Sequence, residues 1–194
     1  ENTPVQLVEE GDLEATLQPL GVTFDRPVVL GSAGETVTDF GAAARVYWTL
    51  KSSGLTDLAI LNGGVAAWTD AGFELSTDAT APTPSTIDIS FQDTWLATTD
   101  DVLAVVNGED EALLLDARPE EFWAGERQHP AAARPGTLPQ SQYFEHASWF
   151  SNGPAIVDPT AAKALAAEQG FDQTEQLVSF CNTGHWAATN WFAL

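Results

Sequence analysis

The sequence lacks methionine and contains one cysteine, Cys181, among its 194 residues. A single cysteine cannot form a disulfide within the chain, and no cluster of zinc-ligating residue types surrounds it. No apolar run approaches the ~20 residues that a membrane-spanning helix needs. No basic start followed by an apolar run indicates a signal peptide. Because a chain without methionine does not begin at its initiator, we expect a processed, trimmed or partial chain.

Basic residues are also scarce, since 7 Lys and Arg stand against 28 Asp and Glu for a formal net charge of −21. Such a chain should repel nucleic acids and anionic membranes, so neither is an expected partner. Surface charge mostly serves solubility, and we expect a soluble bacterial-type protein whose compartment, cytoplasm or periplasm, and oligomeric state stay open. An anionic ligand would need local positive potential, which gives weight to each arginine near a site.

Short apolar runs alternate with helical patterns, which is typical of parallel α/β layers whose strands are buried on both faces. Strands are predicted at 28–30, at 112–115, and in the runs before Asn62 and before Cys181. Helices are predicted over 41–54, with Val46, Tyr47 and Leu50 inward, over 99–106, and after Asp158. Thr98 or Thr99 and Asp158 are the expected N-caps of the last two.

A stretch rich in Ser, Thr, Ala and Pro, residues 76–88, is typical of a linker and predicts two domains, 1–75 and 89–194. The two parts also resemble each other. Each has Gly, then Phe-Asp, a strand, a turn with glycine, and a helix with aromatic residues. A duplicated domain would produce this pattern, with Ser32 in the place of Cys181, although chance similarity between two αβ units would produce it too.

The closing segment "VSFCNTGHWAATNWFAL" places Cys181 between a strand and a helix. Ligands favour this edge of a parallel sheet. Backbone N–H groups of the loop and the helix N-terminus would stabilise a thiolate there, and would hold an anionic substrate. A lone cysteine after an apolar strand is more often an inert buried side chain. The small polar residues that follow, Asn182, Thr183 and Gly184, favour a sulfur at the mouth of a loop.

Three stretches resemble tandem-domain rhodanese-type sulfurtransferases of the thiosulfate or 3-mercaptopyruvate type. "FCNTGHWAATNWFAL" is similar to their Cys-x-x-Gly-x-x-Ala loop and the helix that follows it. "LLLDARPEEFWAGE", with "ARPGTLP" after it, resembles their Asp-Ala-Arg strand end and Pro loop. "ARVYWTLKSSGLTDLAILNGGVAAW" resembles their non-catalytic first domain. The resemblance implies two rhodanese-like α/β domains with parallel sheets flanked by helices, both incomplete at the chain ends.

The resemblance also implies a mechanism without metal or cofactor. The Cys181 thiolate would take sulfur from a small anionic donor as a persulfide and pass it to a thiophilic acceptor such as cyanide or a thiol. Arg118 would bind the anionic part of the donor; the alternative is a surface ion pair with Glu120 or Glu121. The remaining substrate-binding residues are expected to be those that follow the cysteine, Asn182, Thr183, Gly184, His185 and Trp186.

Several residues depart from the family pattern. Thr137 stands in place of a His and Gln140 in place of a Gly, both in the Pro loop, and Asn62 in place of an Asp. Thr183 is neither the Lys of vertebrate thiosulfate enzymes nor the Ser of mercaptopyruvate enzymes. The choice of donor therefore stays open, and we favour thiosulfate. Arg134, in the same loop, is expected to order it.

Other readings compete with this one. His185 invites a Cys–His pair, which the family does not need, while His129 and His146 have no recognisable partner and are expected in loops. Cys-x5-Arg phosphatases and arsenate reductases clamp an oxyanion with an arginine six residues after the cysteine, where this chain has Ala187. A non-enzymatic rhodanese-like module that binds a partner or carries sulfur without turnover remains the other alternative.

Overall fold

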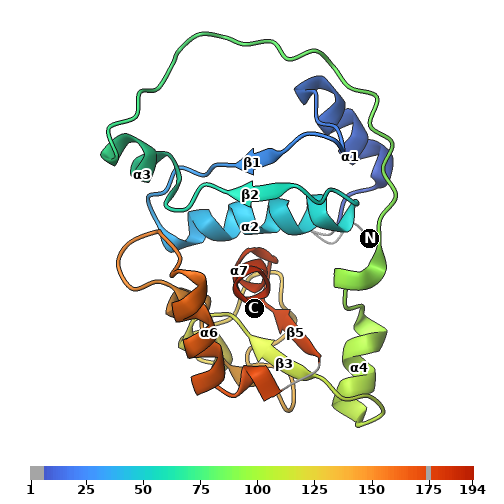
Figure 1. Cartoon of the computed structure of the whole chain (residues 1–194). Coiled ribbons are helices and arrows are strands. Elements are labelled where there is room, and N and C mark those ends of the chain that lie inside the picture. The colour runs from blue at the N-terminus through green and yellow to red at the C-terminus, as the bar shows by residue number, and fades with distance from the viewer. Residues whose placement is uncertain (1–6, 174–175) are drawn as a thin grey trace.

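The computed structural model describes residues 7–173 and 176–194, which form two parallel sheets flanked by helices (Figure 1). The first sheet pairs β1 (Val28–Leu30) with β2 (Leu58–Ile60). The second has the order β4-β3-β5, made of β4 (Gln142–Tyr143), β3 (Leu113–Asp116) and β5 (Leu177–Phe180). All pairings are parallel, so the expected α/β class with parallel sheets is confirmed.

The first half of the chain contains, besides its sheet, four helical segments. They are α1 (Glu10–Leu17), the 3-10 turn η1 (Gln18–Leu20), α2 (Val37–Ser52) and α3 (Gly64–Asp70). A capping box between Thr36 and Asp39 begins α2. Gly63, at φ +80°, makes the turn from β2 into α3. The two glycines of "NGG" therefore form the strand-to-helix turn.

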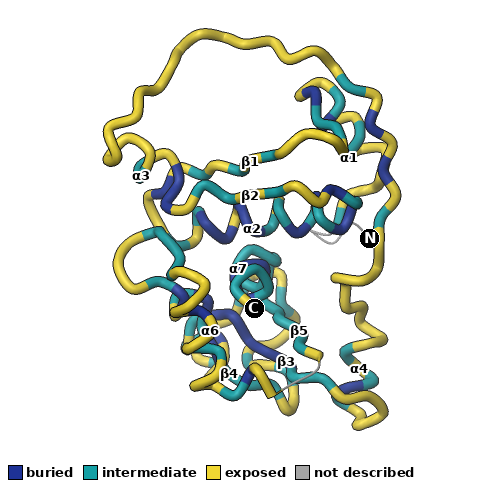
Figure 2. The backbone as a smooth tube through the Cα atoms, viewed as in Figure 1, coloured by how far each residue is buried: buried dark blue, intermediate teal, exposed yellow. Residues whose placement is uncertain are grey.

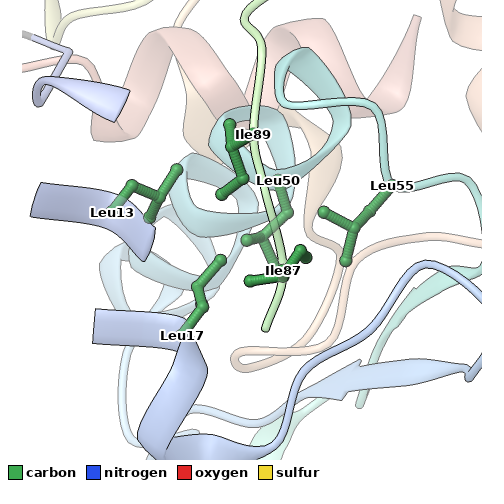
Figure 3. Packing of buried hydrophobic residues seen from close by; sticks show 6 residues of the cluster. All are labelled: Leu13, Leu17, Leu50, Leu55, Ile87 and Ile89. Atoms are coloured by element: carbon green, nitrogen blue, oxygen red, sulfur yellow. The ribbon is translucent and has the colours of Figure 1, made fainter. Parts of the chain in front are cut away.

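The core of this half is an aliphatic cluster of Leu13, Leu17, Leu50, Leu55, Ile87 and Ile89 (Figure 3). Ile87 lies near the end of the stretch 76–88 and Ile89 directly after it, whereas most of that stretch is exposed and has neither helix nor strand (Figure 2). The backbone N–H of Ile89 also donates to the Glu14 side chain. The end of the expected linker is thus held against α1 and α2 by burial and a hydrogen bond.

Helix α2 is buried on two sides, which the sequence pattern did not anticipate. Leu50 faces the aliphatic cluster as predicted and is 2% exposed. Val46 is 46% exposed, so its predicted inward position was wrong. A second buried side of α2, with Phe40 and Ala44, packs against Ala188 of the C-terminal helix and against Ile60 of β2, and Val46 belongs to neither buried side.

The second half contains α4 (Thr99–Asn107), α5 (Glu120–Trp123), α6 (Pro159–Glu168), α7 (His185–Ala193) and the 3-10 turns η2 (Asp93–Trp95), η3 (His146–Trp149) and η4 (Phe171–Gln173). The predicted N-caps are confirmed. Thr98 accepts from the backbone N–H of Asp101, and Asp158 from those of Thr160 and Ala161. Among these residues no helix is long and apolar enough to cross a membrane.

The two halves meet where α2 lies beside α7 (Figure 1). Phe40 packs edge-on against the rings of Phe150 and Phe192, and Ala44 and Ala188 complete the contact. Gly41 allows the close approach, because a Cβ there would lie 2.9 Å from the carbonyl oxygen of His185. The helix that follows Cys181 is therefore braced by a helix of the first half.

A second link between the halves is a pair of hydrogen bonds at Asn62. Its Nδ2 donates to the carbonyl oxygen of Ile156 at 2.9 Å, and its Oδ1 accepts from the N–H of Ile156 at 2.8 Å. The resemblance led us to expect an aspartate here, but a carboxylate only accepts. Asparagine is the residue that satisfies both backbone groups.

Asn62→Asp is therefore expected to lower the free energy of unfolding by about 1 kcal/mol, because one hydrogen bond is lost and a carboxylate faces a carbonyl oxygen. Urea denaturation followed by circular dichroism measures the change. Asn152→Asp, at an exposed position, adds the same charge and is the matched control. Equal destabilisation by both substitutions would contradict the prediction.

Candidate active site

Two loops that leave the second sheet lie side by side at its carboxyl edge. β3 and β5 are adjacent and in register, with Asp116 opposite Phe180. Cys181 follows β5, and Arg118 follows β3 two residues after Asp116. The N–H of Ala117 donates to the carbonyl oxygen of Phe180 and continues the ladder beyond the strands. The geometry thus brings together the two predicted residues, Cys181 and Arg118.

The sulfur of Cys181 accepts hydrogen bonds from the backbone of the turn into α7. The N–H of Gly184 lies 3.0 Å from Sγ and that of Ala187 lies 3.4 Å from it. Gly184 has φ +87° and directly precedes His185, the first residue of α7. The thiol is half-buried. The sulfur therefore lies at a helix N-terminus, in an arrangement of N–H groups that favours negative charge.

Arg118 is buried, with 8% of its surface exposed, and its guanidinium is held by Asp116. Nε donates to Oδ1 at 2.9 Å and Nη2 to Oδ2 at 2.6 Å. The alternative of a surface ion pair with Glu120 or Glu121 was wrong. The chain turns after β3, so the side chain folds back onto the carboxylate at the strand end. Nη1 reaches the loop of Cys181, 3.4 Å from Oδ1 of Asn182.

The Pro loop completes the surroundings of Asp116. Thr137, which stands where the family has His, donates from Oγ1 to Oδ2 of Asp116 at 2.7 Å. The carbonyl oxygen of Gly136 accepts from Nη2 of Arg118 at 2.9 Å. Gln140 has a left-handed backbone, with φ +62°, at the position where the family has Gly. The glutamine thus keeps the conformation that glycine adopts without strain. Arg134 is exposed.

The predicted substrate-binding residues form one loop and the start of α7, but their contacts differ. Nδ2 of Asn182 is buried and has no hydrogen-bond partner among the described residues. Thr183 Oγ1 lies 3.3 Å from Nδ1 of His185. Within the described chain this is the hydrogen-bonding contact found for the His185 ring, which has none to Cys181. Nε1 of Trp186 donates to Thr38 on α2 at 3.4 Å.

His146 was expected to be a loop residue without partners, and this was wrong. It begins η3, is 3% exposed, and stacks on Trp186 with ring centroids 5.0 Å apart. Its Nδ1 lies 3.1 Å from the carbonyl oxygen of Ala117. Burial lowers the pKa of His146 to about 4, so the ring is neutral near pH 7. Trp186 lies far along the chain, so no sequence pattern marks the pair.

Arg45 is the second residue that sequence reasoning missed. It lies on α2 in the first half, yet its guanidinium approaches the loop of Cys181. A Cβ placed on Gly184 would lie 2.5 Å from Nη1 of Arg45. Because basic residues are scarce, any arginine was a candidate for the site. The contact of Arg45 with Gly184 could not be predicted, because the two residues are far apart in the sequence.

Gly184→Ala should therefore strain the backbone and displace Arg45. We expect the free energy of unfolding to fall by more than the ~1–2 kcal/mol of left-handed strain alone, and alkylation of Cys181 by iodoacetamide to slow several-fold. Gly72→Ala is the matched control, because Gly72 has φ +84° and no atom within 4 Å of its would-be Cβ. If both variants change stability equally and leave alkylation unchanged, the prediction fails.

The internal similarity needs one adjustment. β1 ends at Leu30 and β5 at Phe180, so the residue that directly follows each strand is Gly31 and Cys181. Ser32, which the sequence comparison placed opposite Cys181, comes one residue later. The first half thus presents no side-chain nucleophile directly after its strand. Within residues 7–173 and 176–194, no group of three or more His, Cys, Asp or Glu side chains could hold a metal ion.

Comparison with known sequences finds sulfur-transfer proteins, although no family model matches. The "Putative thiosulfate sulfurtransferase SseB" of Mycobacterium tuberculosis is 28% identical over 178 residues, 91% of this chain and 60% of the relative. A "Putative thiosulfate sulfurtransferase" of Haloferax volcanii is 29% identical and covers 100% of this chain and 68% of its own. The "Sulfur carrier protein TtuD" of Thermus thermophilus is 24% identical, with 96% and 67% covered. The chain therefore spans 60% to 68% of these relatives.

Solved structures share the fold. The 3-mercaptopyruvate sulfotransferase SseA of Escherichia coli, described with the "Rhodanese" fold, has a TM-score of 0.76 at 21% identity, over 94% of this chain and 66% of that one. The anaerobic ergothioneine biosynthesis enzyme of Chlorobium limicola has a TM-score of 0.79 at 21% identity, over 96% and 48%. The chain thus has the α/β rhodanese fold, and its resemblance to the rhodanese-type sulfurtransferases is confirmed.

Proposed function

We propose that this chain supplies the catalytic loop of a sulfurtransferase that carries sulfur as a persulfide on Cys181. One observation supports this most directly: Sγ of Cys181 accepts two backbone N–H groups at the N-terminus of α7. Such an arrangement stabilises a thiolate before reaction and a terminal persulfide anion after it. Persulfide chemistry is known on this fold, since EanB, a solved structure with a TM-score of 0.80 at 21% identity, is described with ergothioneine covalently linked with a persulfide cysteine.

The reaction has two steps. The Cys181 thiolate attacks the outer sulfur of thiosulfate, a new S–S bond forms, and the S–S bond of thiosulfate breaks to release sulfite with its electron pair. A thiophile such as cyanide or a thiol then attacks the terminal sulfur of the persulfide, and the Cys181 thiolate leaves. This is covalent catalysis with two half-reactions, and no redox partner is needed because the sulfur moves as a neutral atom between nucleophiles.

Arg118 and the loop residues have supporting roles in this proposal. Because Nε and Nη2 of Arg118 are engaged by Asp116, Nη1 is the nitrogen directed to the loop, where it orients Asn182. The buried N–H₂ group of Asn182 has no hydrogen-bond acceptor among the described residues, and a sulfonate oxygen of thiosulfate would accept from it. Thr183 offers a hydroxyl beside it. The second candidate sulfur donor is 3-mercaptopyruvate, and the turnover rates measured with thiosulfate and with 3-mercaptopyruvate decide between the two.

The test is incubation of the protein with thiosulfate followed by intact mass spectrometry. We expect a gain of one sulfur that cyanide removes with release of thiocyanate. Protein alkylated beforehand at Cys181, the only cysteine, is the control and should gain nothing. Absence of the sulfur adduct on folded, unalkylated protein would refute the proposal.

A sulfur carrier without turnover of its own is the second candidate, because one relative is named a sulfur carrier protein. A carrier and an enzyme both form the persulfide, but they differ in the second step. An enzyme transfers sulfur repeatedly to cyanide or a small thiol with thiosulfate in excess. A carrier releases about one equivalent and then stops until a partner protein accepts or supplies sulfur.

A further inference from the structure

The catalytic loop receives a charged side chain from the other half of the chain. Arg45 lies on α2, near the middle of the helix that packs against α7. Its guanidinium carbon lies 4.7 Å from the ring centre of Trp48, which supports the side chain from one side. On the other side it abuts Gly184, where a Cβ would lie 2.5 Å from Nη1 and 3.2 Å from Cζ. The N–H of that glycine is the one that donates to Cys181 at 3.0 Å.

Charge interactions agree with this placement. Burial lowers the pKa of Arg45, while the charge of Cys181 acts in the opposite direction and favours the guanidinium cation. Burial and then the positive charge of Arg45 lower the pKa of His185, the first residue of α7. Arg45 is therefore close enough to Cys181 for the sulfur's charge to act on the guanidinium, and close enough to His185 to act on that ring.

The overall charge makes a local cation important. The chain has a net charge of −21, so an anion approaching from solution meets a repulsive field over most of the surface. Arg118, the basic residue on the neighbouring loop, is paired bidentately with the buried carboxylate of Asp116. Its charge is thus largely balanced at the strand end. Arg45 is the second guanidinium beside the loop, and it lies against Gly184.

We propose that Arg45 is an anion-recruiting residue of the Cys181 site, so that the active site is composite and the first half provides the charge that draws a small dianionic donor to the thiol. For the identity of that donor the inference rests on the proposed sulfurtransferase function. The recruitment itself does not, because any small anion that reacts with the thiol should experience it.

The experiment compares alkylation of Cys181 by iodoacetate, which is anionic, and by iodoacetamide, which is neutral. The ratio of the two rate constants reports local potential and cancels changes in the reactivity or exposure of the thiol. Arg45→Gln is expected to lower this ratio about 3- to 10-fold at low salt. Arg45→Lys should retain most of it. Lys51→Gln removes a positive charge from the same helix and is the matched control, which should leave the ratio unchanged.

A measurement on the unaltered protein covers the case in which Arg45→Gln does not fold. In the unaltered protein, the ratio of the iodoacetate to the iodoacetamide rate constant should exceed the same ratio for N-acetylcysteine amide, a neutral thiol, despite the net charge of −21. A lower ratio, an unchanged ratio in folded Arg45→Gln, or an equal fall in Lys51→Gln would each overturn the proposal. Failure of the thiosulfate adduct with an intact effect of Arg45 would refute the proposed function alone.

Discussion

Cys181→Ser is expected to abolish both sulfur uptake from thiosulfate and thiocyanate formation, with turnover lowered by at least about 10⁴-fold. A serine hydroxyl stays protonated near neutral pH and cannot store sulfur as a persulfide, so both half-reactions lose their nucleophile. The change replaces one atom, and the N–H groups of Gly184 and Ala187 can donate to the new oxygen. The fold should therefore be preserved while the chemistry is lost.

The measurement is thiocyanate release with thiosulfate and cyanide, alongside intact mass and urea denaturation. Ser179→Ala, on β5 two residues before Cys181, is a control for changes near the site that leave the sulfur in place. Because Cys181 is the only cysteine, any sulfur adduct on Cys181→Ser would have to lie on another residue type. Such an adduct, or turnover above about one per cent of the wild-type rate, would contradict the assignment of Cys181.

Asp116→Ala is expected to lower the free energy of unfolding by about 3–5 kcal/mol, the usual cost of removing one partner from a buried ion pair. Asp116 is fully buried, and its oxygens accept from Nε and Nη2 of Arg118, from the backbone N–H of Arg118 and from Thr137. Alanine would leave a buried guanidinium without its counter-ion. Thermal and urea unfolding measured by circular dichroism give the change.

A double variant separates the ion pair from simple loss of packing. Asp116→Ala combined with Arg118→Met removes both charges and should be more stable than Asp116→Ala alone, because no uncompensated charge remains buried. If the double variant is as unstable as the single one or worse, the destabilisation does not come from the orphaned Arg118. In Asp116→Ala, Arg118 should also lose its position and with it the hydrogen bond to Asn182. Any folded fraction should therefore show a changed rate of alkylation of Cys181.

Local patterns predicted much of the fold. The runs at 28–30 and 112–115 became β1 and, shifted by one residue, β3, and the N-caps at Thr98 and Asp158 were found as expected. These features depend on interactions within a few residues, such as a side-chain oxygen that accepts the N–H groups of the next turn. The position of Cys181 between a strand and a helix was predicted for the same reason.

The partners of the charged and aromatic residues could not be predicted in this way. Val46 was placed inward because one face of α2 was expected to be buried, whereas α7 covers a second face. The alternative for Arg118 was an exposed acidic partner, whereas the turn after β3 directs its guanidinium to the buried Asp116. Each error concerns the direction of a side chain after the backbone turns, which hydrophobic periodicity does not report.

The sequence by itself determined that this protein is an α/β chain with its only thiol at a strand-to-helix turn. The strand, the turn and the helix are each specified by residues close together in the sequence, and the Asn-Thr-Gly turn follows the cysteine directly. Only the tertiary structure decided which charges surround that thiol. Arg45 reaches Gly184, and Trp186 reaches His146, because α2 and η3 pack against α7. Such contacts depend on how distant helices pack to bury their apolar faces, and no local pattern encodes that packing.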